Sequence, residues 1–418
     1  MHAALIADAD YLDDELTEFR QLCAGLIDEQ VQLTRVVPAG VVRAAPRRGT
    51  EPDRRSADAD NPPRGAEPER RSPVARRWRR AGELDGDAAG GPAEGPLAGS
   101  PLFGSRLTWE ASRYGAMDHR RLVRLAEPLA DANVTLIHAL SRGVWSAAAT
   151  LGEQLDAAVI FRAADWSDAD HAARLVRQLR PTRCVLVAAS GPLAAELRRR
   201  TQNLVRVETV FPGVHVQVPR AGGRQPGDPL CVAVAGSGVL DDAYRALLSG
   251  IQQVVAQHPA TQFFFDTPRT DPHRLWRETE RRGLLGHVSF VPRRPGHRDL
   301  LLTADALMLP QATGRTRGVT LRAMARAVPV IAADDPSLDE LTHDHTAWVL
   351  DNPDAAAWAE ALLRVVATPD EANDLGLRAR AWVHEERLAS DQIGRLLNLY
   401  HTMTGEPIGF VGQGGNPA

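Results

Sequence analysis

Cations and glycines gather in one loop of the chain. Gly314 and Gly318 flank Arg315 and Arg317, and Arg322 follows four residues later. A glycine-bearing loop that leads into a helix presents backbone N–H groups to anions, and a guanidinium can hold a phosphate through two parallel hydrogen bonds. The spacing therefore predicts an anion-binding loop, with solvent-facing arginines as the alternative. Arg322 falls near the start of the helix, where a buried cation needs an acidic partner or an anionic ligand.

Two further polar residues follow apolar segments that read as buried strands. His138 lies at the end of residues 133–139, and Asp165 follows residues 157–162. His138 could act as a base or hydrogen-bond donor toward a substrate, or it could be a structural histidine. Asp165 could orient a substrate, or it could cap the helix that begins near residue 168. The sequence leaves both pairs of alternatives open.

The sequence shows no pattern of histidines or cysteines that is typical of a metal site or a reactive thiol. His343 and His345 share one loop but lack a third and a fourth ligand, so we expect a plain loop and no metal. Cys23, Cys184 and Cys231 are scattered without metal-ligand spacing. This pattern indicates reduced core thiols in a cytoplasmic protein.

The composition excludes several classes of protein. All 49 basic residues among the 418 are arginines. Without a lysine, the chain can be neither a phosphate-loop NTPase nor a pyridoxal-phosphate enzyme. The net charge of −4 gives no reason to expect nucleic-acid binding. We expect no membrane-spanning helix, because no run of about 18 apolar residues is present.

The anion-binding loop belongs to a small α/β unit. Residues 306–310 form an apolar run that ends in proline, 321–327 suit a closely packed helix, and 328–333 form the next buried strand. A similar strand, helix and strand lie within residues 3–38, where the helix is expected to start at Asp13. The alternation continues along the chain and predicts two parallel sheets with helices on both faces.

The composition changes abruptly between residues 43 and 106, which are rich in Pro, Gly, Arg and acidic residues. A segment this poor in apolar residues cannot bury enough surface to offset the entropy of ordering, so we expect it to be disordered. Its cluster Arg76–Arg80 is expected to be a solvated charge run, with a contact to anionic lipid or nucleic acid as the alternative. Residues 219–228 have the composition of an interdomain linker.

Several of these segments resemble the family-4 retaining glycosyltransferases, which have the GT-B fold. In the second half they are ADALMLP, RAMARAVPVIAAD and HTAWVLDNPDAAAWAEAL, and the strands of the first half follow the family's order. The resemblance implies an α/β protein of two doubly wound Rossmann-like domains that face a cleft, with a disordered insertion in the first. The expected bounds are 1–222, with the insertion at about 44–106, then 223–388, and finally 389–418 for a helix returning to the first domain plus a flexible tail.

The resemblance also implies a function. We expect a retaining hexosyltransferase that moves a sugar from a nucleotide-sugar donor to a glycan, lipid or small-molecule acceptor, without a cofactor or metal. The leaving phosphate would assist the incoming hydroxyl, so that no protein nucleophile is needed. His138 and Asp165 are the expected catalytic residues on the acceptor side. The expected donor-binding residues are Gly236, Ser237, Gly314, Arg315, Arg317, Gly318, Val319, Thr320 and Arg322.

The sequence departs from the family at its charged positions. The family's arginine and lysine in the second domain fall on Ser237 and on Asp242 or a neighbour. Its two loop glutamates fall on Gly314, or on Arg315 given slack in the alignment, and on Arg322. Losing one charge-stabilising donor costs roughly 10² to 10³ in rate. The alternative is therefore a catalytically inactive GT-B protein that binds or scaffolds a partner.

Overall fold

The computed structural model describes residues 1–39, 104–110, 115–178, 183–215, 218–219, 228–267, 273–292 and 300–405. Most of the predicted insertion, the Arg76–Arg80 cluster, most of the predicted linker and the tail beyond residue 405 lie outside these residues. Within the described part, no helix is long and apolar enough to cross a membrane.

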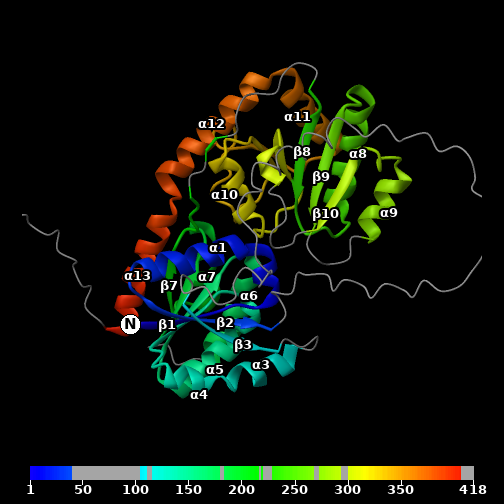
Figure 1. Ribbon diagram of the computed structural model, residues 1–418. Helices are drawn as coiled ribbons and strands as arrows, with labels where there is room; N and C mark the ends of the chain where they lie inside the picture. The colour runs from blue at the N-terminus through cyan, green and yellow to red at the C-terminus, as the bar shows by residue number, and fades with distance from the viewer. Residues whose placement is uncertain are drawn as a thin grey trace, which may run out of the picture. The chain divides into compact units, whose positions relative to one another are not determined.

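The first sheet has seven parallel strands in the order β3-β2-β1-β4-β5-β6-β7 (Figure 1). Its strands are nearly continuous apolar runs, as expected of a sheet that is covered on both faces. The strands are β1 (His2–Ile6), β2 (Gln32–Pro38), β3 (Ser105–Trp109), β4 (Leu136–Ala139), β5 (Ala158–Ala163), β6 (Cys184–Ala188) and β7 (Arg206–Thr209).

Two elements of this sheet differ from expectation. The predicted insertion extends to residue 106, but β3 begins at Ser105 and pairs with β2. The helix expected from Asp13 begins four residues earlier, as α1 (Ala9–Asp28). The earlier start follows from Asp8, whose side chain accepts a hydrogen bond from the backbone N–H of Tyr11 and so caps the helix.

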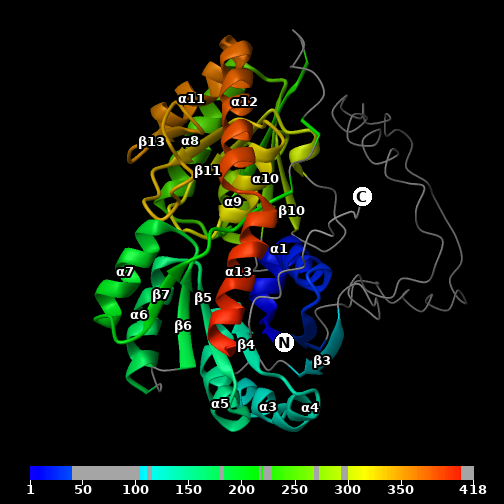
Figure 2. The ribbon, with the colours of Figure 1, turned by 90° about the vertical axis from the view of Figure 1, so that its left-hand side faces the viewer.

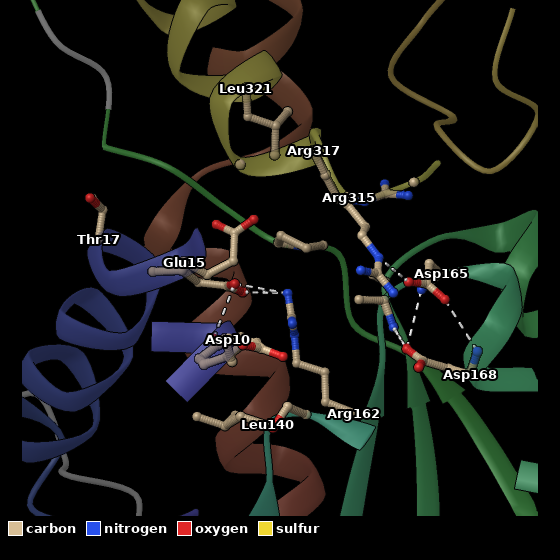
Figure 3. A pocket seen from close by; sticks show the side chains of 18 of the residues that line it. Asp10, Glu15, Thr17, Leu140, Arg162, Asp165, Asp168, Arg315, Arg317 and Leu321 are labelled. Atoms are coloured by element: carbon tan, nitrogen blue, oxygen red, sulfur yellow. Dashed lines mark hydrogen bonds and ion pairs between the residues drawn. The ribbon is translucent and has the colours of Figure 1, made fainter. Parts of the chain in front are cut away.

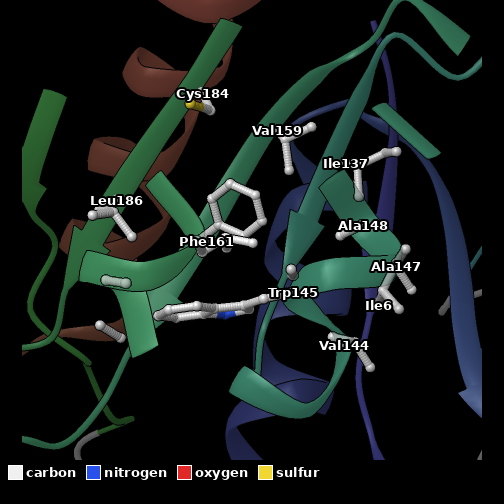
Figure 4. Close-up of a cluster of buried hydrophobic side chains, with 14 of the residues drawn as sticks. Ile6, Ile137, Val144, Trp145, Ala147, Ala148, Val159, Phe161, Cys184 and Leu186 are labelled. Atoms are coloured by element: carbon white, nitrogen blue, oxygen red, sulfur yellow. The ribbon is translucent and has the colours of Figure 1, made fainter. Parts of the chain in front are cut away.

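Helices cover both faces of the first sheet. Trp145 and Phe161 belong to one fully buried cluster, with their rings 5.7 Å apart in an edge-to-face arrangement (Figure 4). That cluster holds residues of α3 (Gly115–Val123), α4 (Ala126–Asp131), α5 (Trp145–Leu155), α6 (Trp166–Leu175) and α7 (Gly191–Thr201). The last helix, α13 (Ala389–Thr404), lies beside α1 and β4 (Figure 2).

The second sheet has six parallel strands in the order β10-β9-β8-β11-β12-β13. They are β8 (Leu230–Ala235), β9 (Thr261–Thr267), β10 (Val288–Pro292), β11 (Ala306–Leu309), β12 (Val330–Ala333) and β13 (Trp348–Leu350). The helices are α8 (Asp242–Gln257), α9 (His273–Arg281), α10 (Arg317–Ala325), α11 (Ala355–Ala367) and α12 (Pro369–Glu386).

The second sheet is also covered on both faces. One buried cluster combines its strands with α8, α9 and α11 around Trp358, and another combines them with α10 and part of α12 around Met324. The prediction of two parallel sheets with helices is therefore confirmed. Both sheets belong to one compact unit, and the domain boundaries at residues 222 and 388 stay predictions.

Candidate functional site

A polar cavity of about 280 Å³ lies where the carboxyl ends of β1, β4 and β5 meet the start of α10 (Figure 3). Crevices at the carboxyl ends of parallel strands are the usual ligand sites of such sheets. Charged side chains of both signs line the cavity: Asp8, Asp10, Glu15, Glu18, Asp165 and Asp168, together with Arg142, Arg162, Arg315, Arg317 and Arg322.

A buried ion pair forms one wall of the cavity. Nη2 of Arg162, from β5, lies 2.8 and 3.0 Å from the two carboxylate oxygens of Glu18 on α1. Tyr11 and Gln392 also donate hydrogen bonds to Glu18, at 3.2 and 3.1 Å. Burial alone would lower the pKa of Arg162, but the charge of Glu18, together with smaller effects of Tyr11, Glu15 and Asp168, outweighs burial and raises that pKa. The sequence analysis missed this pair, although an arginine within the apolar run AVIFRA was a signal.

Asp165 has two roles in the structure. Its carboxylate caps α6, accepting from the backbone N–H groups of Ser167 at 2.8 Å and Asp168 at 3.2 Å, and it pairs with Nε of Arg315 at 2.9 Å. Burial would raise the pKa of Asp165, but the hydrogen bonds from Ser167 and Arg315 outweigh it and lower that pKa. The capping alternative is thus confirmed. Asp165 also lines the cavity, and its catalytic role stays a prediction.

The two loop arginines have partners within the protein. Arg315 pairs with Asp165 and keeps 58% of its side chain exposed. Arg317 points inward with 5% exposed, and it binds Glu340 at 2.6 Å and Asp339 at 3.2 Å. Burial raises the pKa of the Glu340 carboxyl to about 7. Both arginines line the cavity, and their role in donor binding stays a prediction.

Arg322 differs from both. It lies in the last turn of α10, not near the helix start that the sequence predicted, because the helix already begins at Arg317. Its side chain lines the cavity and is half-buried. Across the described parts of the chain, no hydrogen bond or ion pair reaches its guanidinium. The sequence analysis left an acidic partner or an anionic ligand as the alternatives for Arg322. Among the described residues, the structure provides no acidic partner.

Two glycines let the loop pack closely. Gly314 has a φ of 69°, in the left-handed region, and its N–H donates to Asp335 at 2.7 Å. Gly318 lies against Glu15, because a Cβ added at Gly318 would be 2.2 Å from Oε2 of that carboxylate. Both glycines line the cavity. Glu15 was not singled out from the sequence, since nothing local marks it.

The other predicted donor-binding residues lie outside the cavity lining. Val319 and Thr320 are on α10, and the Thr320 hydroxyl donates to the carbonyl of Thr316 at 2.8 Å. Gly236 and Ser237 follow β8, where the N–H of Ser237 donates to Gln311 at 2.8 Å. A Cβ at Gly236 would lie 2.6 Å from the hydroxyl of Tyr244. Side chains of the protein itself thus fill the space beside Gly236 and Ser237.

His138 is buried, with 1% exposed, and lies outside the cavity lining. Its Nδ1 is 2.8 Å from the hydroxyl of Tyr400 on α13. Burial, and to a smaller extent Arg162, lowers the pKa of His138 to about 3. This environment favours the structural alternative, while the catalytic role is a prediction that no contact of His138 supports.

The histidine and cysteine residues that the sequence analysis considered for metal or thiol chemistry have structural surroundings. Nδ1 of His343 accepts from the N–H of Val349 at 3.1 Å, within the loop expected for it. Cys23, Cys184 and Cys231 are buried and form no disulfide bond. No group of three potential metal ligands gathers anywhere in the portion of the chain that the structure describes.

Comparisons with known proteins bear on the second sheet and on the whole fold. Residues 229–368 match the family described as glycosyl transferases group 1. No curated protein sequence matches the chain. Among solved structures, the sucrose-phosphate synthase from Thermosynechococcus elongatus is similar with a TM-score of 0.68 at 17% identity, over 97% of this chain and 100% of that one.

Two further solved structures are similar over nearly their full length. Anabaena Alr3699/HepE in complex with UDP and glucose has a TM-score of 0.65 at 10% identity, over 96% of this chain and 100% of that one. A glycosyltransferase from Rickettsia africae has a TM-score of 0.63 at 11% identity, over 97% and 99%.

The protein therefore has the GT-B fold, as the resemblance implied. Residues 229–368, which match the family described as glycosyl transferases group 1, include the loop and helix on one side of the cavity. The fold and this match together support a glycosyltransferase function.

Proposed function

We propose that the protein transfers a sugar from a nucleotide-sugar donor, bound in the polar cavity, to a glycan, lipid or small-molecule acceptor. The observation that carries this proposal is the position of the group 1 domain. The loop and α10, which line the cavity, lie within its residues 229–368. The cavity also offers what a sugar transfer needs, namely carboxylates that accept from hydroxyls and guanidiniums that donate to oxygen anions.

We further propose that the transfer is of the family-4 type, moves a hexose and retains the anomeric configuration. The bond between the anomeric carbon and the leaving phosphate oxygen breaks, and the acceptor oxygen bonds to the same face. The acceptor's proton passes to the leaving phosphate, so the charges balance without a protein nucleophile. Anomeric proton couplings of the product, measured by NMR, should match those of the donor sugar.

The test of the function is turnover with a matched pair of variants. Wild type should release the nucleoside diphosphate from a UDP-, GDP- or ADP-sugar when acceptors are supplied. Gly318→Leu puts a side chain into the cavity lining and should abolish this release. Gly394→Leu adds the same side chain on α13, where a Cβ meets open space, and should leave it unchanged. EDTA should not reduce turnover, because the proposed reaction uses no metal.

Two results would contradict the proposal. One is wild-type protein that neither turns over nor gains thermal stability with any of these donors, since a ligand that binds the native state raises its melting temperature. The other is turnover that survives Gly318→Leu, which would place the reaction outside this cavity.

A further inference from the structure

The arginines of the cavity differ in how they are neutralised. Arg142 lies 3.8 Å from Asp168, and Arg162, Arg315 and Arg317 each lie within 2.9 Å of a carboxylate oxygen. Arg322 has no such partner among the described residues. A half-buried guanidinium without a counter-ion loses hydration, and the carbonyl end of α10, in whose last turn Arg322 lies, offsets only part of this loss. An anionic ligand in the cavity would supply the missing interaction.

The position of Arg322 on α10 places it beside a second charge. Arg322 follows Gly318 by one helical turn, so the two residues share a face of the helix, and both line the cavity. The Glu15 carboxylate lies against Gly318 and points from α1 toward this helix (Figure 3). A backbone kink in α1 at Glu15, with φ −125° and ψ 32°, accompanies this placement.

These two residues have opposite effects on an anion. A phosphate or carboxylate group next to Arg322 gains charge-assisted hydrogen bonds, which are roughly twice as strong as neutral ones. Because Glu15 lies against Gly318, one helical turn before Arg322 on α10, its negative charge would repel the same group. Affinity for the anion is then set by the difference between the two interactions.

We propose that Arg322 binds an anionic group of the donor and that Glu15 weakens this binding. The proposal rests on the function proposed above. The diphosphate of the nucleotide is one source of the anion, and the carboxylate of an acidic sugar is the other. Glu15 limits product inhibition in this scheme, because it opposes retention of the released nucleoside diphosphate.

Calorimetry with the full chain tests the proposal. The probes are UDP, GDP and ADP, each with its parent nucleoside, and inorganic pyrophosphate. Arg322→Gln should weaken the diphosphates by roughly tenfold or more, as expected for hydrogen bonds to a charged group, and leave the nucleosides unchanged. Arg326→Gln removes an arginine one turn further along, outside the cavity lining, and should bind like wild type. Glu15→Gln should tighten the diphosphates and leave the nucleosides unchanged.

Arg322→Gln and Glu15→Gln are expected to change affinity in opposite directions. Misfolding cannot explain both results, because a misfolded variant would not bind the diphosphates more tightly. The proposal is overturned if Arg322→Gln binds every anionic probe like wild type, or if nucleosides and diphosphates weaken equally. If no diphosphate binds wild type but pyrophosphate binds and is lost in Arg322→Gln, the anion site stands and the nucleotide-dependent function falls.

A second pair of probes identifies the source of the anion. UDP-glucose and UDP-glucuronate differ by one carboxylate. If Arg322→Gln weakens both donors equally, the anion is the diphosphate. If it weakens UDP-glucuronate alone, the anion is the sugar carboxylate.

Discussion

The burial of His138 predicts a pH dependence of stability that can be calculated. Burial, with a smaller effect of Arg162, lowers the pKa of this side chain to about 3, against about 6.5 for an accessible histidine. Between these values the unfolded chain binds the proton and the folded chain does not. The contribution of His138 is therefore complete above pH 6.5 and is lost as the pH falls toward 3. At about pH 5 the loss is about 2 kcal/mol, because each unit below 6.5 costs about 1.4 kcal/mol.

Urea unfolding at about pH 7.5 and about pH 5 measures this loss. Other groups also titrate in this range, so the quantity of interest is the difference between wild type and His138→Gln, which keeps a polar group near Tyr400 but does not titrate. Wild type should lose about 2 kcal/mol more than this variant. His273→Gln, which changes an exposed histidine on α9, should behave like wild type. Equal losses in wild type and His138→Gln would refute the reasoning, and would make His138 accessible enough to act on a substrate.

Three further perturbations follow from the packing. Glu18→Ala leaves Arg162 buried without its counter-ion and should lower the free energy of unfolding by about 3–5 kcal/mol, measured with urea. In Gly318→Ala, the new Cβ displaces the Glu15 carboxylate, so the substitution should raise the free energy of unfolding by the full helix-propensity benefit of about 1 kcal/mol only when Glu15→Ala is also present. A double-mutant cycle that finds no coupling between the two substitutions would contradict this. Trp358→Ala should cost about 3–5 kcal/mol in the second core, and a small change would show that the cluster collapses around the gap.

The resemblance to a known family named nine donor-binding residues, whose role in donor binding stays a prediction. Five of them, Gly314, Arg315, Arg317, Gly318 and Arg322, line the cavity. Gly236 and Ser237 do not, because Gln311 and Tyr244 fill the space beside them. The sequence position of a residue therefore does not show whether it faces the cavity, because that depends on side chains from other elements.

The sequence by itself determined the two parallel sheets and the alternation of strands and helices along the chain, and it offered capping as one of two roles for Asp165. These features depend on hydrophobic periodicity and on residues a few positions apart, which any stretch of the chain displays locally. Only the tertiary structure decided the charges of the cavity. Glu18 meets Arg162 across 144 residues, and Arg317 turns inward to Glu340, while Arg322 pairs with none of the residues that the structure describes. Such ion pairs depend on which elements pack together. The charge of a residue within its own segment does not show which distant residue will neutralise it.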